Sequence, residues 1–87
     1  MELLEVFEDV GAVILFDAPN EKLAVRLVFK PSGKTKDVIV DDVYFRNIEV
    51  STLEASPTVH IDFKENTTLY LYKSNGQISL SNIQKPS

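Results

Sequence analysis

His60 and Asp62 are the residues whose types and spacing best suit acid–base chemistry. They lie two apart in a stretch where apolar and polar residues alternate, so both side chains are expected on the polar face of one strand. A carboxylate beside an imidazole can orient it as a general base. The sequence has one histidine, no cysteine and no serine in a recognisable nucleophile motif, however, and catalysis needs a set of groups. We therefore predict surface residues, no catalytic site and no enzyme.

Adjacent acids at Asp41 and Asp42 carry the oxygen ligands that hard cations prefer. Neighbouring residues of a strand point to opposite faces, and the sequence has no Asp-x-Asp-x-Asp-Gly loop. The sequence thus predicts solvated residues at an irregularity of a strand, no metal site and no cofactor.

The loop from Lys30 to Lys36 contains Ser-Gly-Lys-Thr, the ending of a phosphate-binding P-loop. The motif needs a glycine five residues before Gly33, where this chain has Val28, and a helix afterwards, where it has Val-Ile-Val at 38–40. A nucleotide site is therefore rejected. The loop keeps three candidates for holding an anion or the acidic patch of a partner, namely Lys30, Lys34 and Lys36.

Tyr70 and Tyr72 are the most informative aromatic pair. They alternate with Leu69 and Leu71, so they should stand side by side on the face opposite the core, about 7 Å apart along one strand. Exposed aromatic rings stack on sugars or bases, or form the centre of a protein interface. The alternative is that the N-terminal segment or Val28 covers both rings. We name three residues as candidates for an interface or for stacking on a ligand: Tyr70, Tyr72 and Tyr44.

The stretch from Val59 to Ile83 must position most of these residues, and we expect three strands joined by two turns there. Glu65-Asn66 is the first expected turn, and Ser74-Asn75-Gly76 the second, because Asn-Gly tolerates the positive φ angles of a type I′ turn. The apolar residues that alternate along the three strands should face one core: Val59, Ile61, Phe63, Leu69, Leu71, Ile78 and Leu80.

The N-terminal segment has two possible structures. The apolar residues of Glu2 to Val10 fit one face of a helix, whereas a strand from Glu2 to Phe7 that turns through Glu8 to Gly11 fits as well. The apolar run from Ala12 to Phe16 should be a strand covered on both faces, or on one face by another subunit.

Strand patterns follow in the middle of the chain. Leu23 to Phe29 alternates cleanly, and Asp37 to Thr52 alternates with two changes of phase, near Asp41-Asp42 and near Arg46-Asn47. A bulge or bend at each change would keep the apolar residues, Val50 included, facing one core. We predict an all-β fold, or a mostly β fold with one short N-terminal helix, of six or seven antiparallel strands in a small meander curled into a barrel or a two-layer roll.

Composition and charge narrow the function. Residues 1–87 should form a single domain with a frayed tail at 84–87, and no apolar run approaches the ~18 residues of a membrane span. The net charge is −4, with five acids and no base in residues 1–17, which argues against nucleic-acid binding. We expect a cytoplasmic protein with no membrane partner. It should act through protein–protein interaction, as a homo-oligomer such as a homodimer or as an accessory subunit. The alternative is a module that binds a small ligand or an anion.

Overall fold

The computed structural model describes residues 1–52 and 58–84, and every regular element in this part of the chain is a strand. The all-β prediction is confirmed, and the N-terminal helix is absent. The described residues contain no helix able to cross a lipid bilayer. The strands are β1 (Glu2–Ala18), β2 (Lys22–Phe29), β3 (Thr35–Val40), β4 (Asp42–Tyr44), β5 (Ile48–Thr52), β6 (Val59–Ser74) and β7 (Gln77–Ser81).

The seven strands belong to one sheet in the order β3-β2-β1-β6-β7-β4, and β5 pairs with the first part of β6. All pairs are antiparallel except β4 and β7, which are parallel. The prediction of a purely antiparallel meander is therefore wrong. β1 lies beside β6 and not only beside its neighbour in sequence, because β6 is long enough to pair along nearly the whole of β1.

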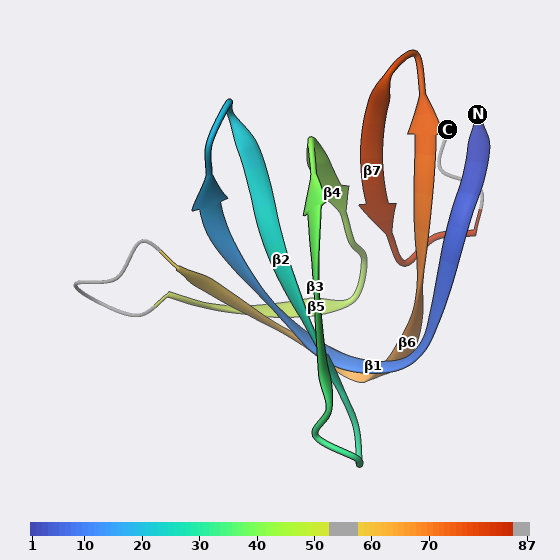
Figure 1. Cartoon of the computed structure of the whole chain (residues 1–87). Coiled ribbons are helices and arrows are strands. Elements are labelled where there is room, and N and C mark those ends of the chain that lie inside the picture. The colour runs from blue at the N-terminus through green and yellow to red at the C-terminus, as the bar shows by residue number, and fades with distance from the viewer. Residues whose placement is uncertain (53–57, 85–87) are drawn as a thin grey trace.

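Two long bent strands give the molecule its shape. In Figure 1, β1 descends from the N-terminus, bends, and rises again beside β2, while β6 follows it, so that the sheet has two arms. Asp9 has a φ of 61°, and the register between β1 and β6 shifts at Val10. The segment before Gly11 is thus neither a helix nor a strand followed by a turn: it is one continuous strand with a bulge.

The expected turn at Glu65-Asn66 is absent, because β6 continues through both residues. These residues lie at the bend of β6, where the Asn66 side chain donates a hydrogen bond to the Lys30 carbonyl (3.0 Å). Residues that favour turns also suit an exposed bend, so the local sequence does not distinguish a turn between two strands from a bend within one strand. The second turn is confirmed, since Asn75 and Gly76 have φ angles of 51° and 79° and Ser74 pairs with Gln77.

The core lies between the two arms of the sheet. All seven residues of the predicted inward set are buried in the core or pack against it.

The two predicted changes of phase correspond to breaks between strands: Asp41 separates β3 from β4, and Asn47, with a φ of 55°, precedes β5. Val50 is an exception, because it is 60% exposed on the edge strand β5 although its partner Ile61 is buried.

The sheet is not closed into a barrel, and the predicted detail of a barrel or two-layer roll is therefore not confirmed. β3 and β4 are the two end strands of the sheet order, and Asp41 is the single residue between them in the chain. Its N–H donates to the Ile78 carbonyl (2.8 Å), and its carboxylate accepts the Ile78 N–H (2.7 Å) and binds the Lys22 ammonium. The Lys22 hydrogen bond, followed by that of Ile78, lowers the pKa of Asp41. Asp41 is therefore a tie between β2 and β7 rather than a solvated bulge residue.

The expected frayed tail lies outside the described residues except for Gln84, whose carbonyl accepts a hydrogen bond from the Tyr72 hydroxyl.

Candidate interaction surface

The register of four strands brings the three predicted tyrosines onto one face. Paired residues of adjacent strands point to the same side of a sheet. One cross-strand row is Tyr44–Ser81–Tyr70–Val6, and the next is Asp42–Ser79–Tyr72–Leu3. We call this surface the tyrosine face and define it by Leu3, Val6, Tyr44, Tyr70, Tyr72, Ser79 and Ser81.

The tyrosine face lies opposite the core. Leu69, Leu71 and Leu80, which alternate with its residues, are in the core or pack against it. The strands that carry the face are the first part of β1, the last part of β6, and β7 and β4 (Figure 1). Alternation alone therefore separates the tyrosines from the core, as the sequence predicted for Tyr70 and Tyr72.

Exposure differs sharply among the three rings. Tyr44 is 53% exposed, Tyr70 is half-buried and Tyr72 is 8% exposed. The rings of Tyr70 and Tyr72 lie 6.2 Å apart at an interplanar angle of 32°, within the range of favourable aromatic pairs. The apolar neighbours Leu3 and Val6 are 50% and 44% exposed. The accessible part of the face is therefore Tyr44, Tyr70, Leu3 and Val6.

The chain after β7 contacts the buried Tyr72. The Tyr72 hydroxyl donates to the Gln84 carbonyl, and the Ile83 N–H donates to the Ser81 hydroxyl (2.9 Å). The chain thus turns back over this part of the sheet. Tyr72 is buried and bonded to the C-terminal segment, whereas Tyr70 is only half-buried. Val28 lies in the other arm, paired with Ala12, and so covers neither ring.

A hollow of about 200 Å³ lies on this face between the larger side chains. The small serine side chains leave this space, because each of the two rows has a serine of β7 beside a tyrosine of β6. The Ser79 hydroxyl donates to the Asp42 carboxylate at one side. The hollow is lined by Met1, Asp42, Tyr44, Tyr72, Ser74, Ser79 and Ser81.

The opposite arm carries a second outer surface, on which the only histidine of the sequence lies. The register aligns five residues across β3, β2, β1, β6 and β5, and Phe16 lies beside them. We call this surface the Arg26 face and define it by Ile14, Phe16, Arg26, Asp37, Ser51 and His60.

The charged groups of the Arg26 face are already paired. Arg26 donates two hydrogen bonds to Asp37 (Nε to Oδ1, 2.9 Å; Nη2 to Oδ2, 3.1 Å), and its guanidinium lies 5.4 Å from the centre of the Phe16 ring. The hydrogen bond from Arg26 lowers the pKa of Asp37, and the same bond raises the pKa of Arg26. This face therefore has its ionic partners within the chain.

His60 lies 3.1 Å from the Asp62 carboxylate, as expected for two residues on one face of a strand. Both side chains are more than a third exposed. Ser51 is the cross-strand neighbour of His60, but among residues 1–52 and 58–84 no hydrogen bond joins its hydroxyl to the imidazole. The geometry thus gives an exposed contact between an imidazole and a carboxylate, without an activated nucleophile beside it.

Lys30 and Lys34 lie on the connection between β2 and β3, and Lys36 is the second residue of β3. All are exposed, and the described residues contain no ion pair to any of them. The aliphatic stem of Lys30 packs over Gly11, where an added Cβ would meet the Lys30 Cδ at 2.4 Å. Gly33 has a φ of 78°, which suits glycine in this turn. The side chain of Lys30 is thus held in part by its packing against Gly11, so Lys34 and Lys36 are the better candidates for binding an anion.

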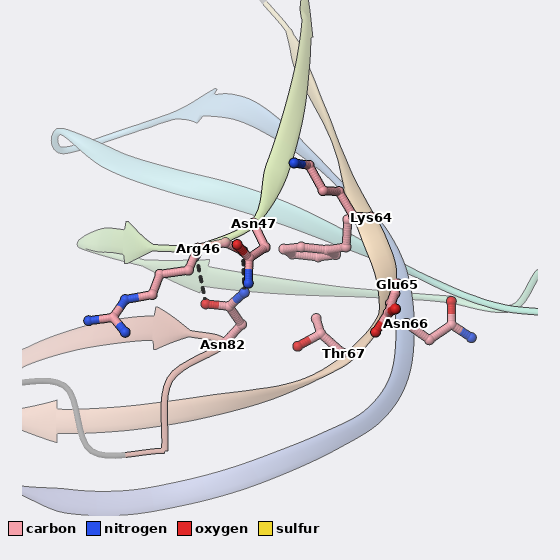
Figure 2. Close-up of a pocket in the computed structure, with 8 residues that line it drawn as sticks. Arg46, Asn47, Lys64, Glu65, Asn66, Thr67 and Asn82 are labelled. Carbon is pink, nitrogen blue, oxygen red and sulfur yellow. Dashed lines mark hydrogen bonds between the residues drawn. The ribbon is translucent and has the colours of Figure 1, made fainter.

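Sequence reasoning missed a polar cleft of about 330 Å³ beside the bend of β6 (Figure 2). The Asn82 side chain accepts the Arg46 N–H (2.9 Å) and donates to the Arg46 carbonyl (2.7 Å). In Figure 2 the Arg46 guanidinium and the Asn66 amide point away from the other labelled side chains. The Asn66 amide binds the Lys30 carbonyl, as described above. The side-chain amides of Asn82 and Asn66 therefore form hydrogen bonds to backbone groups far away in the sequence. The cleft has no local sequence signal, because residues from separate parts of the chain line it.

Within the described residues, no three His, Cys, Asp or Glu side chains are grouped so that they could hold a metal ion. Comparisons of the chain with protein-family profiles, with curated protein sequences and with solved structures each found no match.

Proposed function

We propose that this chain is a non-catalytic module that binds another protein chain through the tyrosine face. The observation that carries the proposal is the convergence of Tyr44 with Tyr70, from strands far apart in sequence, on one surface with exposed Leu3 and Val6. Tyrosines in apolar surroundings are enriched at the centres of protein interfaces, because the ring buries a large area and the hydroxyl finds a partner.

The electrostatics of the face support a protein rather than a nucleic acid as the bound molecule. Asp42 borders the hollow, and the part of β1 that forms the edge of the face contains acids and no base. A phosphate backbone would be repelled there, whereas rings with free hydroxyls suit a polypeptide. Within the described part of the chain, the hydroxyls of Tyr44 and Tyr70 have no hydrogen-bond partner. We also predict, as part of this proposal, that the protein is cytoplasmic and forms homo-oligomers.

The test is the solution mass by light scattering over a range of concentrations, combined with capture of partners from an extract. The variant is Tyr44→Ser with Tyr70→Ser, which leaves the buried Tyr72 in place. Ile39→Ser is the matched control, since Ile39 is an exposed apolar residue of the other arm (55% exposed). We expect the tyrosine variant to lose association that the control keeps. A wild-type protein that is monomeric and captures nothing would refute the proposal.

Anion binding by the segment from Lys30 to Lys36, at the start of β3, is a second candidate, favoured by the exposed side chains of Lys34 and Lys36, which have no ion pair among the described residues. Amide chemical shifts recorded during titration with inorganic phosphate test it. We expect shifts near Gly33 that disappear in a Lys34→Gln, Lys36→Gln variant. Unchanged spectra of the wild-type protein would eliminate this function.

A further inference from the structure

The first part of β1 has a free edge next to the tyrosine face. β2 begins to pair with β1 only at Val10, whereas β6 pairs along β1 from Glu2 onward. On the side of β1 that faces away from β6, residues 2–9 therefore pair with none of the described strands. The edge ends at Asp9, whose carbonyl accepts the Lys30 N–H (3.0 Å). Such an edge presents a row of N–H and C=O groups to which another extended chain can add.

The charged side chains along this edge determine which kind of strand can bind there. Glu2, Glu5, Glu8 and Asp9 are exposed, and residues 1–17 contain no Lys or Arg. Two copies of the edge placed against each other would oppose carboxylates, and like charges directly opposite on paired strands are destabilising. A strand that carries Lys or Arg would gain from the same arrangement.

Apolar side chains also reach the edge. Leu3 and Val6 belong to the tyrosine face, and Leu4 beside them is 41% exposed. An added strand would therefore lay its alternate apolar side chains next to Leu3 and Val6 and continue the tyrosine face by one strand. Amphipathic alternation of basic and apolar residues fits both properties of the edge.

We infer that the partner of the tyrosine face binds as an added strand along residues 2–9 of β1, and that it is an extended segment in which Lys or Arg alternates with apolar residues. This inference rests on the proposed function, because it names the chemistry of the chain that the same surface binds. It assigns two roles to the acids of β1: they recognise the partner, and they prevent this edge from pairing with the same edge of a second copy.

Two short capped peptides serve as probes, one alternating Lys with Val and the other alternating Glu with Val. Binding to the full chain is measured by fluorescence anisotropy at low ionic strength, and amide hydrogen exchange locates the bound peptide. The edge variant is Glu2→Lys, Glu5→Lys, Glu8→Lys. The control, Asp17→Lys, Glu21→Lys, Glu49→Lys, makes the same change of net charge at exposed acids outside the edge.

We expect the wild-type protein to bind the lysine peptide and to protect the amides of residues 2–9. The edge variant should lose affinity for it by about tenfold or more and prefer the glutamate peptide, whereas the control keeps the wild-type preference. Three results would overturn the inference: no binding of the lysine peptide by the wild-type protein, equal losses in both variants, or unchanged exchange at residues 2–9.

The tyrosine variant separates this inference from the proposed function. Peptide binding that survives in the edge variant and disappears in Tyr44→Ser, Tyr70→Ser would overturn strand addition and leave the tyrosine face as the binding surface. Partner capture that is unaffected by the tyrosine variant would refute the proposed function itself.

Discussion

The tyrosine face and the Arg26 face are the outer surfaces of the two arms of one bent sheet, yet they differ in how their polar groups are satisfied. On the Arg26 face, the guanidinium binds Asp37 and covers Phe16, and His60 lies beside Asp62. On the tyrosine face, Tyr44 and Tyr70 keep hydroxyls with no partner among the described residues. A surface whose polar groups already have partners gains little by binding, whereas free hydroxyls beside exposed apolar side chains gain both hydrogen bonds and buried area.

The largest expected effect is on the free energy of unfolding. It tests whether the residues of the tyrosine face lie outside the core that packs beneath them. Leu80→Ala should lower the free energy of unfolding by about 3 kcal/mol, because Leu80 is fully buried on β7 beneath the face and its loss leaves a cavity. Leu3→Ala, at a residue that is 50% exposed, should cost under about 1 kcal/mol. Urea unfolding followed by circular dichroism measures both. Equal costs would show that Leu3 belongs to the core and that the comparison is wrong.

A smaller effect separates the structural tyrosine from the accessible one. Tyr72→Phe removes the donor to the Gln84 carbonyl and should lower the free energy of unfolding by about 1 kcal/mol. Tyr44→Phe removes a hydroxyl without a described partner and should change it by less than about 0.5 kcal/mol. The same urea experiment compares the two variants. A larger loss for Tyr44→Phe would mean that its hydroxyl has an internal role and is not available to a partner.

The smallest effect is confined to the Arg26 face and depends on pH. Because Arg26 lowers the pKa of Asp37 below the reference value of 3.8, this carboxylate contributes stability above pH 3.8 that is lost as the pH falls through its folded pKa. Arg26→Gln and Asp37→Asn should each make the loss of stability less steep as the pH falls below about 4. Thermal unfolding at a series of pH values measures this. Tyr44→Phe is the control and should keep the wild-type slope, and a wild-type slope in both charge variants would contradict the assignment.

Local patterns predicted several elements correctly. Val59, Ile61 and Phe63 alternate with polar residues and line the core, and Asn75-Gly76 makes the tight turn before β7. Glu65-Asn66 was misread because turn-forming residues suit a bend as well as a reversal. A hairpin forms only where the following strand pairs with the preceding one, and here both halves of β6 pair with β1 instead.

The candidate site was predictable in part. The shared face of Tyr70 and Tyr72 follows from alternation, whereas the bond that Tyr72 donates to Gln84, twelve residues further on, does not. Neither the link between Asn82 and Arg46 nor the tie of Asp41 to Lys22 and Ile78 has a local signature, since each joins residues from strands or turns far apart in sequence.

The sequence by itself determined which side chains share a face of their own strand, because successive residues of an extended chain point to opposite sides. It also determined the acidity of the N-terminal segment and the position of the Asn75-Gly76 turn. Only the tertiary structure decided that Tyr44 joins Tyr70 through Ser81, and that residues 2–9 of β1 keep a free edge. Both depend on which strands pair and in which register, and backbone hydrogen bonds form with equal ease between any two strands until the whole core selects one arrangement.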